Sequence, residues 1–220
     1  MRLRPVLSLV AVWFVALSLF SARAYAKNEV AFWNWFVANE PRIFNFESNQ
    51  EVVFAELTKE LNRVNSSLTF EFGPVENSKR EFVISAAGIR SAFPAVEALY
   101  NKAPRLPRWV WVKFRPRRFP LHDLTYGGKE VRAEDVRYLL AKDGDKVGIV
   151  MFFGGYKDSE KVTFGQIGYL FLDEALGEYT VETQVGFVEF QSRESKYFGR
   201  SHPLRELPGD FDDYVEQRRQ

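Results

Sequence analysis

The chain has 220 residues, a formal net charge of +1, 46% hydrophobic residues and no cysteine. Without cysteine it can contain neither a disulfide nor a lipid-modified N-terminal cysteine, so its core forms without covalent cross-links. Its near-neutral charge argues against a general nucleic-acid binder, which is usually strongly basic, and we expect no specific nucleic-acid partner.

Residues 1–26 have the pattern of a secretory signal peptide. Arg2 and Arg4 give a basic start, residues 6–20 are apolar and uncharged, and residues 24–26 have the small-x-small sequence that signal peptidase accepts. The apolar run is about 15 residues long, shorter than the ~20 of a membrane-spanning helix. We predict cleavage near Ala26, export to the periplasm or the extracellular space, and no transmembrane span in the mature chain. An uncleaved N-terminal anchor is the alternative.

The remaining residues, 27–220, predict one α+β domain with a mostly antiparallel sheet and helices packed on it. No repeat, low-complexity tract or Gly/Ser-rich linker divides them. Loss of the signal peptide removes three arginines and no acidic residue, which lowers the formal net charge to −2. The mature chain is long enough to bury a sizeable core.

The first half of the mature chain predicts three helices and a hairpin. Apolar residues at helical spacing indicate a helix over residues 30–40 that ends at Pro41. Ser48 and Glu51 have the spacing of a capping box at the start of a second helix, which ends at residues 65–67. Alternating apolar residues then predict strands at 68–73 and 80–86, joined as an antiparallel pair, before a helix over 91–103 with Pro94 in its first turn.

The second half predicts a further hairpin, a long helix and a last strand. Asp143-Gly144 separates two strands, of which the second, residues 146–153, is apolar on both faces and therefore central. A helix follows from Ser159 to Gly177, where two internal glycines suggest a close approach to the sheet. Residues 179–191 predict the last strand, and the C-terminal residues can add a short helix.

The segment "RWVWVKFRPRR" at residues 108–118 is the most distinctive stretch. On a strand one face would carry two aromatic rings and three cations, while Val110, Val112 and Phe114 would form the opposite, core face. The candidate ligand-binding residues on the first face are Trp109, Trp111, Lys113, Arg115 and Arg117. They suit an anionic glycan, lipid or protein partner. The alternative is that a helix covers the tryptophans and only the basic end reaches water.

Catalytic and metal-binding patterns are weak. His122 is the only candidate catalytic residue, and it cannot pair with Asp123 because adjacent residues of an extended chain point to opposite faces. The chain has two histidines and no cysteine, so we expect no metal site and no cofactor. Asp173, Glu174 and Glu178 form the tightest acidic group, at a helix C-terminus where the dipole disfavours negative charge.

The segments "FWNWF", "LTFEFGP", "KREFVISAAGI", "FPAVEALYNKAP" and "RWVWVKFRPRR" together resemble a family of uncharacterised bacterial proteins classed as a domain of unknown function. The resemblance covers most of residues 32–118 and is one of overall pattern. It implies a bacterial domain of this family and brings no assigned catalytic residue.

The sequence as a whole favours an exported bacterial cell-envelope protein that is a non-enzymatic binding or interaction module, with the basic aromatic strand as its ligand surface. The alternative is a hydrolase or transferase that acts on anionic envelope material with carboxylates and His122.

Overall fold

A computed structural model describes residues 28–218 of the chain. The predicted signal peptide at residues 1–26 therefore lies outside the described residues. The described chain forms two compact units: residues 28–84 with 91–111, and residues 85–90 with 112–218. The single domain expected from the sequence stays a prediction.

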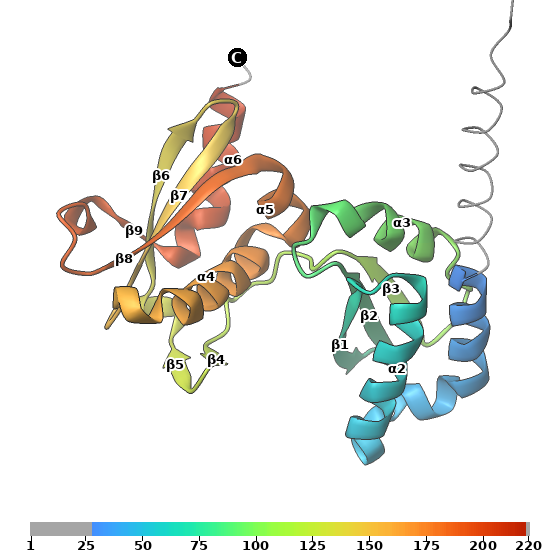
Figure 1. Cartoon of the computed structure of the whole chain (residues 1–220). Helices are drawn as coiled ribbons and strands as arrows, with labels where there is room; N and C mark the ends of the chain where they lie inside the picture. The colour runs from blue at the N-terminus through green and yellow to red at the C-terminus, as the bar shows by residue number, and fades with distance from the viewer. Residues whose placement is uncertain (1–27, 219–220) are drawn as a thin grey trace, which may run out of the picture. The chain divides into compact units, whose positions relative to one another are not determined.

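The first unit contains helices and a three-stranded sheet of order β1-β2-β3 (Figure 1). Residues 28–44 are helical, and a short 3-10 helix, Phe46–Asn49, leads into the next helix. The further elements are α2 (Gln50–Val64), β1 (Thr69–Glu76), β2 (Lys79–Ser85), α3 (Phe93–Asn101) and β3 (Trp109–Lys113). The predicted hairpin is confirmed: only Asn77 and Ser78 join β1 to β2, and both have positive φ, as the tightest hairpin turns require.

The core of the first unit is built from aromatic rings. Phe36 has no exposed surface, and its ring lies 5.0 Å from that of Trp109 and 5.3 Å from that of Phe82. The rings of Trp109 and Trp111 stack with their centroids 5.5 Å apart. Aromatic contacts of this kind add stability beyond the area they bury. The helix over residues 28–44 therefore packs against the tryptophan side of β3.

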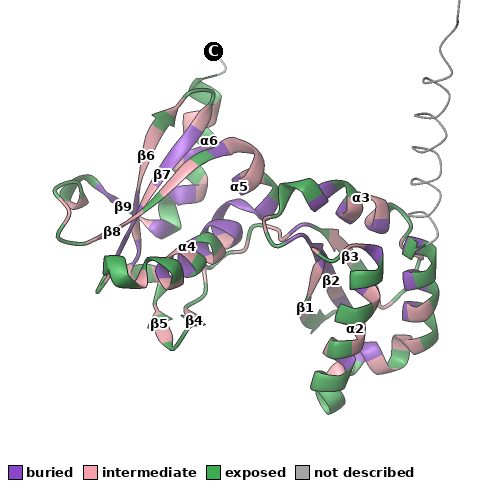
Figure 2. Ribbon diagram, in the orientation of Figure 1, coloured by how far each residue is buried: buried purple, intermediate pink, exposed green. Residues whose placement is uncertain are grey.

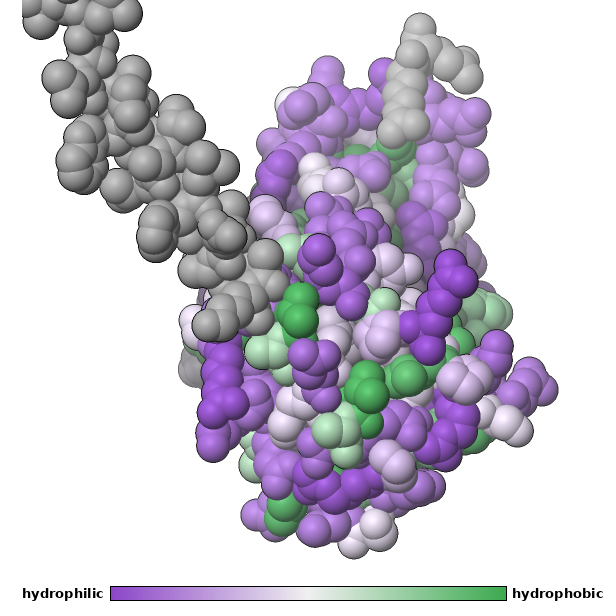
Figure 3. Space-filling view, turned by 90° about the vertical axis from the view of Figure 1, so that its right-hand side faces the viewer, coloured by the Kyte–Doolittle hydropathy of each residue, from purple (hydrophilic) through white to green (hydrophobic). Residues whose placement is uncertain are grey.

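The predicted faces of β3 are wrong. Val110, assigned to the core face, is 43% exposed, whereas Trp109 is 5% exposed. Phe114, assigned to the same core face, is buried as predicted but follows the end of β3. The alternation of the strand was correct, but the larger aromatic side chains take the side that the helix covers, since they bury more apolar area than valine. Figure 3 shows a largely hydrophilic surface with scattered hydrophobic side chains on the face toward the viewer.

Two helix ends also differ from the prediction. The first helix continues through Pro41 to residue 44, and the Asn45 amide donates to the Pro41 carbonyl. Proline lacks only its own amide donor, and this helix continues past it. The second helix begins at Gln50 rather than after Ser48, and no side chain caps it. The Ser48 hydroxyl donates instead to the Asn45 carbonyl, so the predicted capping box is absent.

The second unit contains a two-stranded and a four-stranded sheet. β4 (Leu124–Tyr126) and β5 (Lys129–Val131) pair antiparallel, and the larger sheet has the order β8-β7-β6-β9. Its strands are β6 (Arg137–Asp143), β7 (Lys146–Phe153), β8 (Val185–Ser192) and β9 (His202–Pro203). The helices are α4 (Lys161–Leu176), α5 (Glu178–Gln184) and α6 (Leu207–Gln217). β6 pairs antiparallel with β7 and β9, while β7 and β8 are parallel.

Several expectations for this unit are confirmed and one is wrong. The hairpin β6-β7 forms, with Gly144 and Asp145 as its loop, and β7 is central and buried on both faces (Figure 2). Residues 179–184, predicted as strand, are helical. Gly177 has a φ of +82° and separates α4 from α5, so the β-branched residues that suggested a strand lie in a second helix.

The fold class is α+β, as predicted. Helices α4 and α6 supply apolar residues to one cluster with the four-stranded sheet, including Phe171, Leu207 and Phe211. None of the described helices is long and apolar enough to span a membrane.

Candidate functional site

The two tryptophans predicted to bind ligand lie in the aromatic core of the first unit. The Trp109 indole N–H donates to the Glu40 carboxylate at 2.7 Å, and the Trp111 indole N–H donates to the Pro104 carbonyl at 2.7 Å. Trp111 is half-buried and Trp109 is buried. Both rings and both indole N–H groups therefore have partners inside the first unit. This agrees with the alternative interpretation, in which a helix covers the tryptophans.

The two arginines that follow in the chain have carboxylate partners in the second unit. Arg115 lies 3.2 Å from Asp173, and Arg117 forms a two-pronged ion pair with Asp212 at 2.7 and 2.9 Å. This pairing lowers the pKa of Asp212 through its hydrogen bonds to Arg117. The remaining predicted residue, Lys113, is exposed at the end of β3. The structure does not gather the five residues into one surface, and ligand binding by them stays a prediction.

His122 and Asp123 have different partners, as expected for adjacent residues. The His122 ring nitrogen Nδ1 is 2.5 Å from the Glu174 carboxylate, and the His122 amide donates to the same carboxylate at 3.2 Å. Asp123 accepts a hydrogen bond from the Ala133 amide. The imidazole is 70% exposed. The pair with Glu174 could not be predicted from sequence spacing, because 52 residues separate the two side chains.

The acidic group around Gly177 is largely internal. Glu178 is fully buried and accepts hydrogen bonds from the amides of Ala86, Gly88 and Arg115 at 3.0–3.1 Å. Burial raises the pKa of Asp173 to about 7, an effect that nearby Glu178 reinforces and Arg115 opposes. The sequence had assigned these residues to a solvated helix end. Instead, Glu178 is the first residue of α5. Its carboxylate holds the backbone of residues 85–90 and of Arg115 in place within the second unit through these hydrogen bonds.

A hollow lies between strand β6 and helix α6 of the second unit. Its volume is about 350 Å³, and it is named here the β6–α6 hollow. The lining residues are Tyr138, Leu139, Leu140, His202, Asp210, Asp213, Tyr214 and Gln217. The four helical members follow the spacing i, i+3, i+4, i+7, which places them on one side of α6. Leu207 and Phe211 on the same helix are buried in the core.

The buried Tyr138 and the partly exposed Asp210 form one corner of the hollow. The Tyr138 hydroxyl donates to the Asp210 carboxylate at 2.5 Å. Burial raises the pKa of Tyr138, and the bond to Asp210 raises it further. The tyrosine therefore stays protonated, and its hydroxyl engages one carboxylate oxygen of Asp210.

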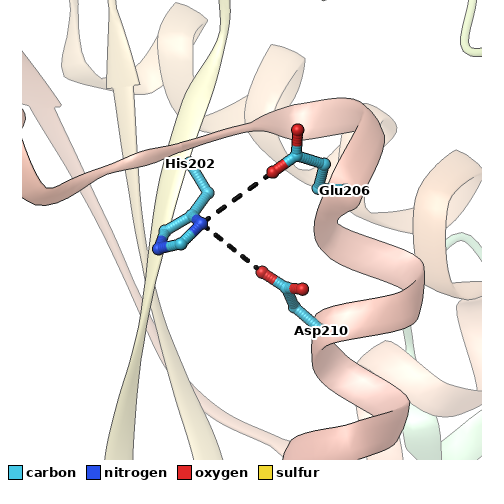
Figure 4. Close-up of side chains that lie close together, drawn as sticks. All are labelled: His202, Glu206 and Asp210. Atoms are coloured by element: carbon cyan, nitrogen blue, oxygen red, sulfur yellow. Dashed lines mark ion pairs between the residues drawn. The ribbon is translucent and has the colours of Figure 1, made fainter.

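His202, Glu206 and Asp210 lie together at the same place (Figure 4). The His202 nitrogen Nδ1 is 3.7 Å from the Asp210 carboxylate and 3.9 Å from that of Glu206. The potential ligand atoms of all three lie within 4.8 Å of one another. Imidazole and carboxylate are groups that bind divalent metal ions. If a metal ion is held by the described residues, these three side chains are the group that can hold it.

Sequence analysis missed this site although its residues follow a regular pattern. His202, Glu206 and Asp210 are each four residues apart, which would have put them on one side of a continuous helix. In the structure His202 lies on β9, and the chain enters α6 only at Leu207. The sequence allows a short helix in this C-terminal segment, and that helix forms as α6, but the spacing of the three side chains was not assigned a role.

No family model, curated protein or solved structure shows a significant similarity to this chain.

Proposed function

We propose that this chain is an exported bacterial cell-envelope protein that acts as a non-enzymatic binding module, and that it holds a positively charged partner in the β6–α6 hollow. One observation carries the proposal. The hollow is lined by Asp210 and Asp213, Glu206 lies next to it, and no lysine or arginine is among its lining residues. Acidic side chains around a concave surface attract cationic partners and speed their association. Export is inferred from residues 1–26.

The location of charge favours this hollow over the basic strand. An anionic partner at Arg115 or Arg117 would have to displace Asp173 or Asp212, which already neutralise those guanidinium groups. Asp213 and Glu206 are exposed. Glu206 has Arg205 at 3.6 Å, whereas Asp213 has no arginine or lysine among the ion pairs of the described residues. We therefore retain the non-enzymatic binding module predicted from the sequence, but we assign its partner surface to the β6–α6 hollow rather than to the basic strand.

Binding of a fluorescein-labelled hexalysine, followed by fluorescence anisotropy, tests the proposal. The full chain should bind the probe, and added salt should weaken binding because the contacts are ionic. Asp213→Asn should reduce affinity about threefold, the scale of one exposed ion pair. Glu216→Gln makes the same charge change on α6 outside the hollow and should have little effect. Equal effects of the two substitutions would reject the hollow as the site.

A second candidate function is acid–base catalysis by His122. The specific observation is the contact of its Nδ1 with Glu174, which orients the ring and leaves Nε2 for a substrate. A panel of ester, glycoside, peptide and phosphoester substrates tests it. This candidate predicts that His122→Ala removes an activity without changing the thermal transition. If no substrate is turned over, only the binding function is retained.

A further inference from the structure

Strand β6 has an open edge beside the β6–α6 hollow. Its neighbour β9 pairs only with Arg137 and Tyr138, and within residues 28–218 no other strand pairs with β6 on this side. The strand runs on to Asp143, so five of its residues, 139–143, have no strand partner there. An open edge of about 17 Å results, given the rise per residue of an antiparallel strand.

The hydrogen-bonding direction of the open edge follows from the bond next to it. The Leu204 amide donates to the Val136 carbonyl at 3.0 Å, so the main chain of Val136 faces this side. Main-chain groups of a strand alternate in direction. The main-chain N–H and C=O groups of Leu140 and Lys142 therefore also point outward. Those of Leu139 and Ala141 point toward β7. The open edge offers two amides and two carbonyls to an incoming strand.

Helix α6 forms the opposite wall of this edge. Its residues from Asp210 to Gln217 line the hollow and extend over about 10 Å along the helix axis. The other wall is β6 itself, through residues 138–140. A channel between a strand edge and a helix is the geometry in which proteins take up an extended peptide as an added strand.

On the basis of the proposed function, we propose that the partner is an extended basic peptide segment that pairs with the open edge of β6. Charge complementarity selects a basic peptide, because Asp210, Asp213 and Glu206 surround the hollow. The Tyr214 ring already has the Arg218 guanidinium 5.9 Å from its centroid, so a lysine or arginine of the peptide would share or displace this cation–π contact. Lys142 is exposed near the hairpin and repels cations, so the basic residues lie toward the His202 end of the hollow and apolar residues lie nearer the hairpin.

Two labelled peptides test strand pairing directly. The first is a six-residue peptide of alternating lysine and valine. The second is the same peptide N-methylated at alternate residues, which keeps the charge but removes the amide donors along one side. Anisotropy with the full chain should show the methylated peptide bound about 20-fold more weakly, as expected for two lost main-chain hydrogen bonds. Methylation at the other alternate residues is the matched control and should change affinity little.

Hydrogen exchange locates the added strand. Binding of the unmethylated peptide should slow exchange of the outward amides of Leu140 and Lys142, while the amides of Leu139 and Ala141 should change little. Asp213→Asn should reduce the affinity of the lysine–valine peptide about threefold, and Glu216→Gln should not. These residues are exposed on α6, so neither substitution should unfold the chain.

The outcomes separate this inference from the proposed function. If both methylated peptides bind like the parent while Asp213→Asn still weakens binding, the cationic hollow is retained and strand pairing is rejected. If neither hexalysine nor the lysine–valine peptide binds, the proposed function fails as well. If peptides bind only after Zn²⁺ is added and His202→Ala abolishes this, the ligand of the hollow is a metal ion and the free strand edge is not its recognition element.

Discussion

The two units of this chain have no disulfides, and different kinds of side chain stabilise their cores. The first fills its interior with aromatic rings, in which Phe36, Phe82 and Trp109 contact one another. The second packs aliphatic and phenylalanine side chains on a four-stranded sheet and also encloses the carboxylates of Asp173 and Glu178. The first unit depends on buried apolar area, whereas the second also depends on buried polar groups with fixed partners.

This difference explains why the most conspicuous sequence feature misled. Tryptophans interleaved with cations suggest a ligand surface, but the first unit uses those rings as core. In the second unit, carboxylates lie in two kinds of place. Some are buried and accept hydrogen bonds from the backbone, and others surround the β6–α6 hollow. Aromatic and charged composition alone does not distinguish a surface from an interior, since the covering helix decides which side of a strand is buried.

The largest expected effect is the loss of a core ring from the first unit. Trp109→Ala should lower the free energy of unfolding by about 4 kcal/mol, because it leaves a cavity among the rings and removes the donor to Glu40. Urea denaturation followed by tryptophan fluorescence measures it. All tryptophans among the described residues, at positions 33, 35, 109 and 111, lie in the first unit, so the signal reports that unit.

Val110→Ala is the matched control on the same strand. Val110 is 43% exposed, and its truncation should cost about 0.5 kcal/mol or less. Equal costs for the two substitutions would contradict the burial of the tryptophan side of β3.

The second unit should depend comparably on one buried carboxylate. Glu178→Ala leaves the amides of Ala86, Gly88 and Arg115 without their acceptor, and should lower the free energy of unfolding by about 3 kcal/mol. Urea denaturation followed by circular dichroism measures the loss. The exposed Glu216→Ala is the control and should be nearly neutral. An unchanged denaturation midpoint for Glu178→Ala would show that its hydrogen bonds to Ala86, Gly88 and Arg115 do not stabilise the second unit.

The sequence predicted local structure well where periodicity is strong. The helix that follows Asn49, the central strand β7 and the helix that ends at Gly177 all agree with the structure. The last strand forms from Val185 as predicted, but the prediction is wrong for residues 179–184, which contain β-branched residues that favour strand and are helical after the break at Gly177. Local propensity is a weak prior when tertiary contacts compete with it.

The candidate site was harder to predict than the fold. Its members come from β6, β9 and α6, and only the folded chain brings Tyr138 within hydrogen-bond distance of Asp210, 72 residues away. The same holds for His122 with Glu174. Sequence spacing can find partners on one helix, such as Asp210, Asp213 and Tyr214 on α6, but not partners that meet across a sheet.

The buried carboxylate Asp173 should make stability depend on pH. Its pKa rises from 3.8 to about 7 in the folded chain, so between about pH 4 and pH 7 the folded state holds a proton that the unfolded state has lost. Folding stability from this group is therefore present below pH 4 and falls as the pH rises toward 7, by at most about 4 kcal/mol. Asp173→Asn should remove this fall. Denaturation midpoints from pH 4 to pH 8 for both proteins measure it, and parallel profiles would contradict it.

The smallest expected effect distinguishes two glycines of α4. A Cβ at Gly168 would lie 2.2 Å from the Phe190 ring of β8, whereas a Cβ at Gly165 would lie 3.6 Å from it, an ordinary contact. Gly168→Ala should therefore destabilise the second unit by about 1–2 kcal/mol, because Phe190 has to move. Gly165→Ala should stabilise it by up to about 1 kcal/mol through helix propensity. Thermal unfolding followed by circular dichroism should give midpoint shifts of opposite sign. The sequence predicts a close approach of the sheet to both glycines. Midpoint shifts of the same sign for the two substitutions would support that prediction and would contradict the difference between Gly165 and Gly168.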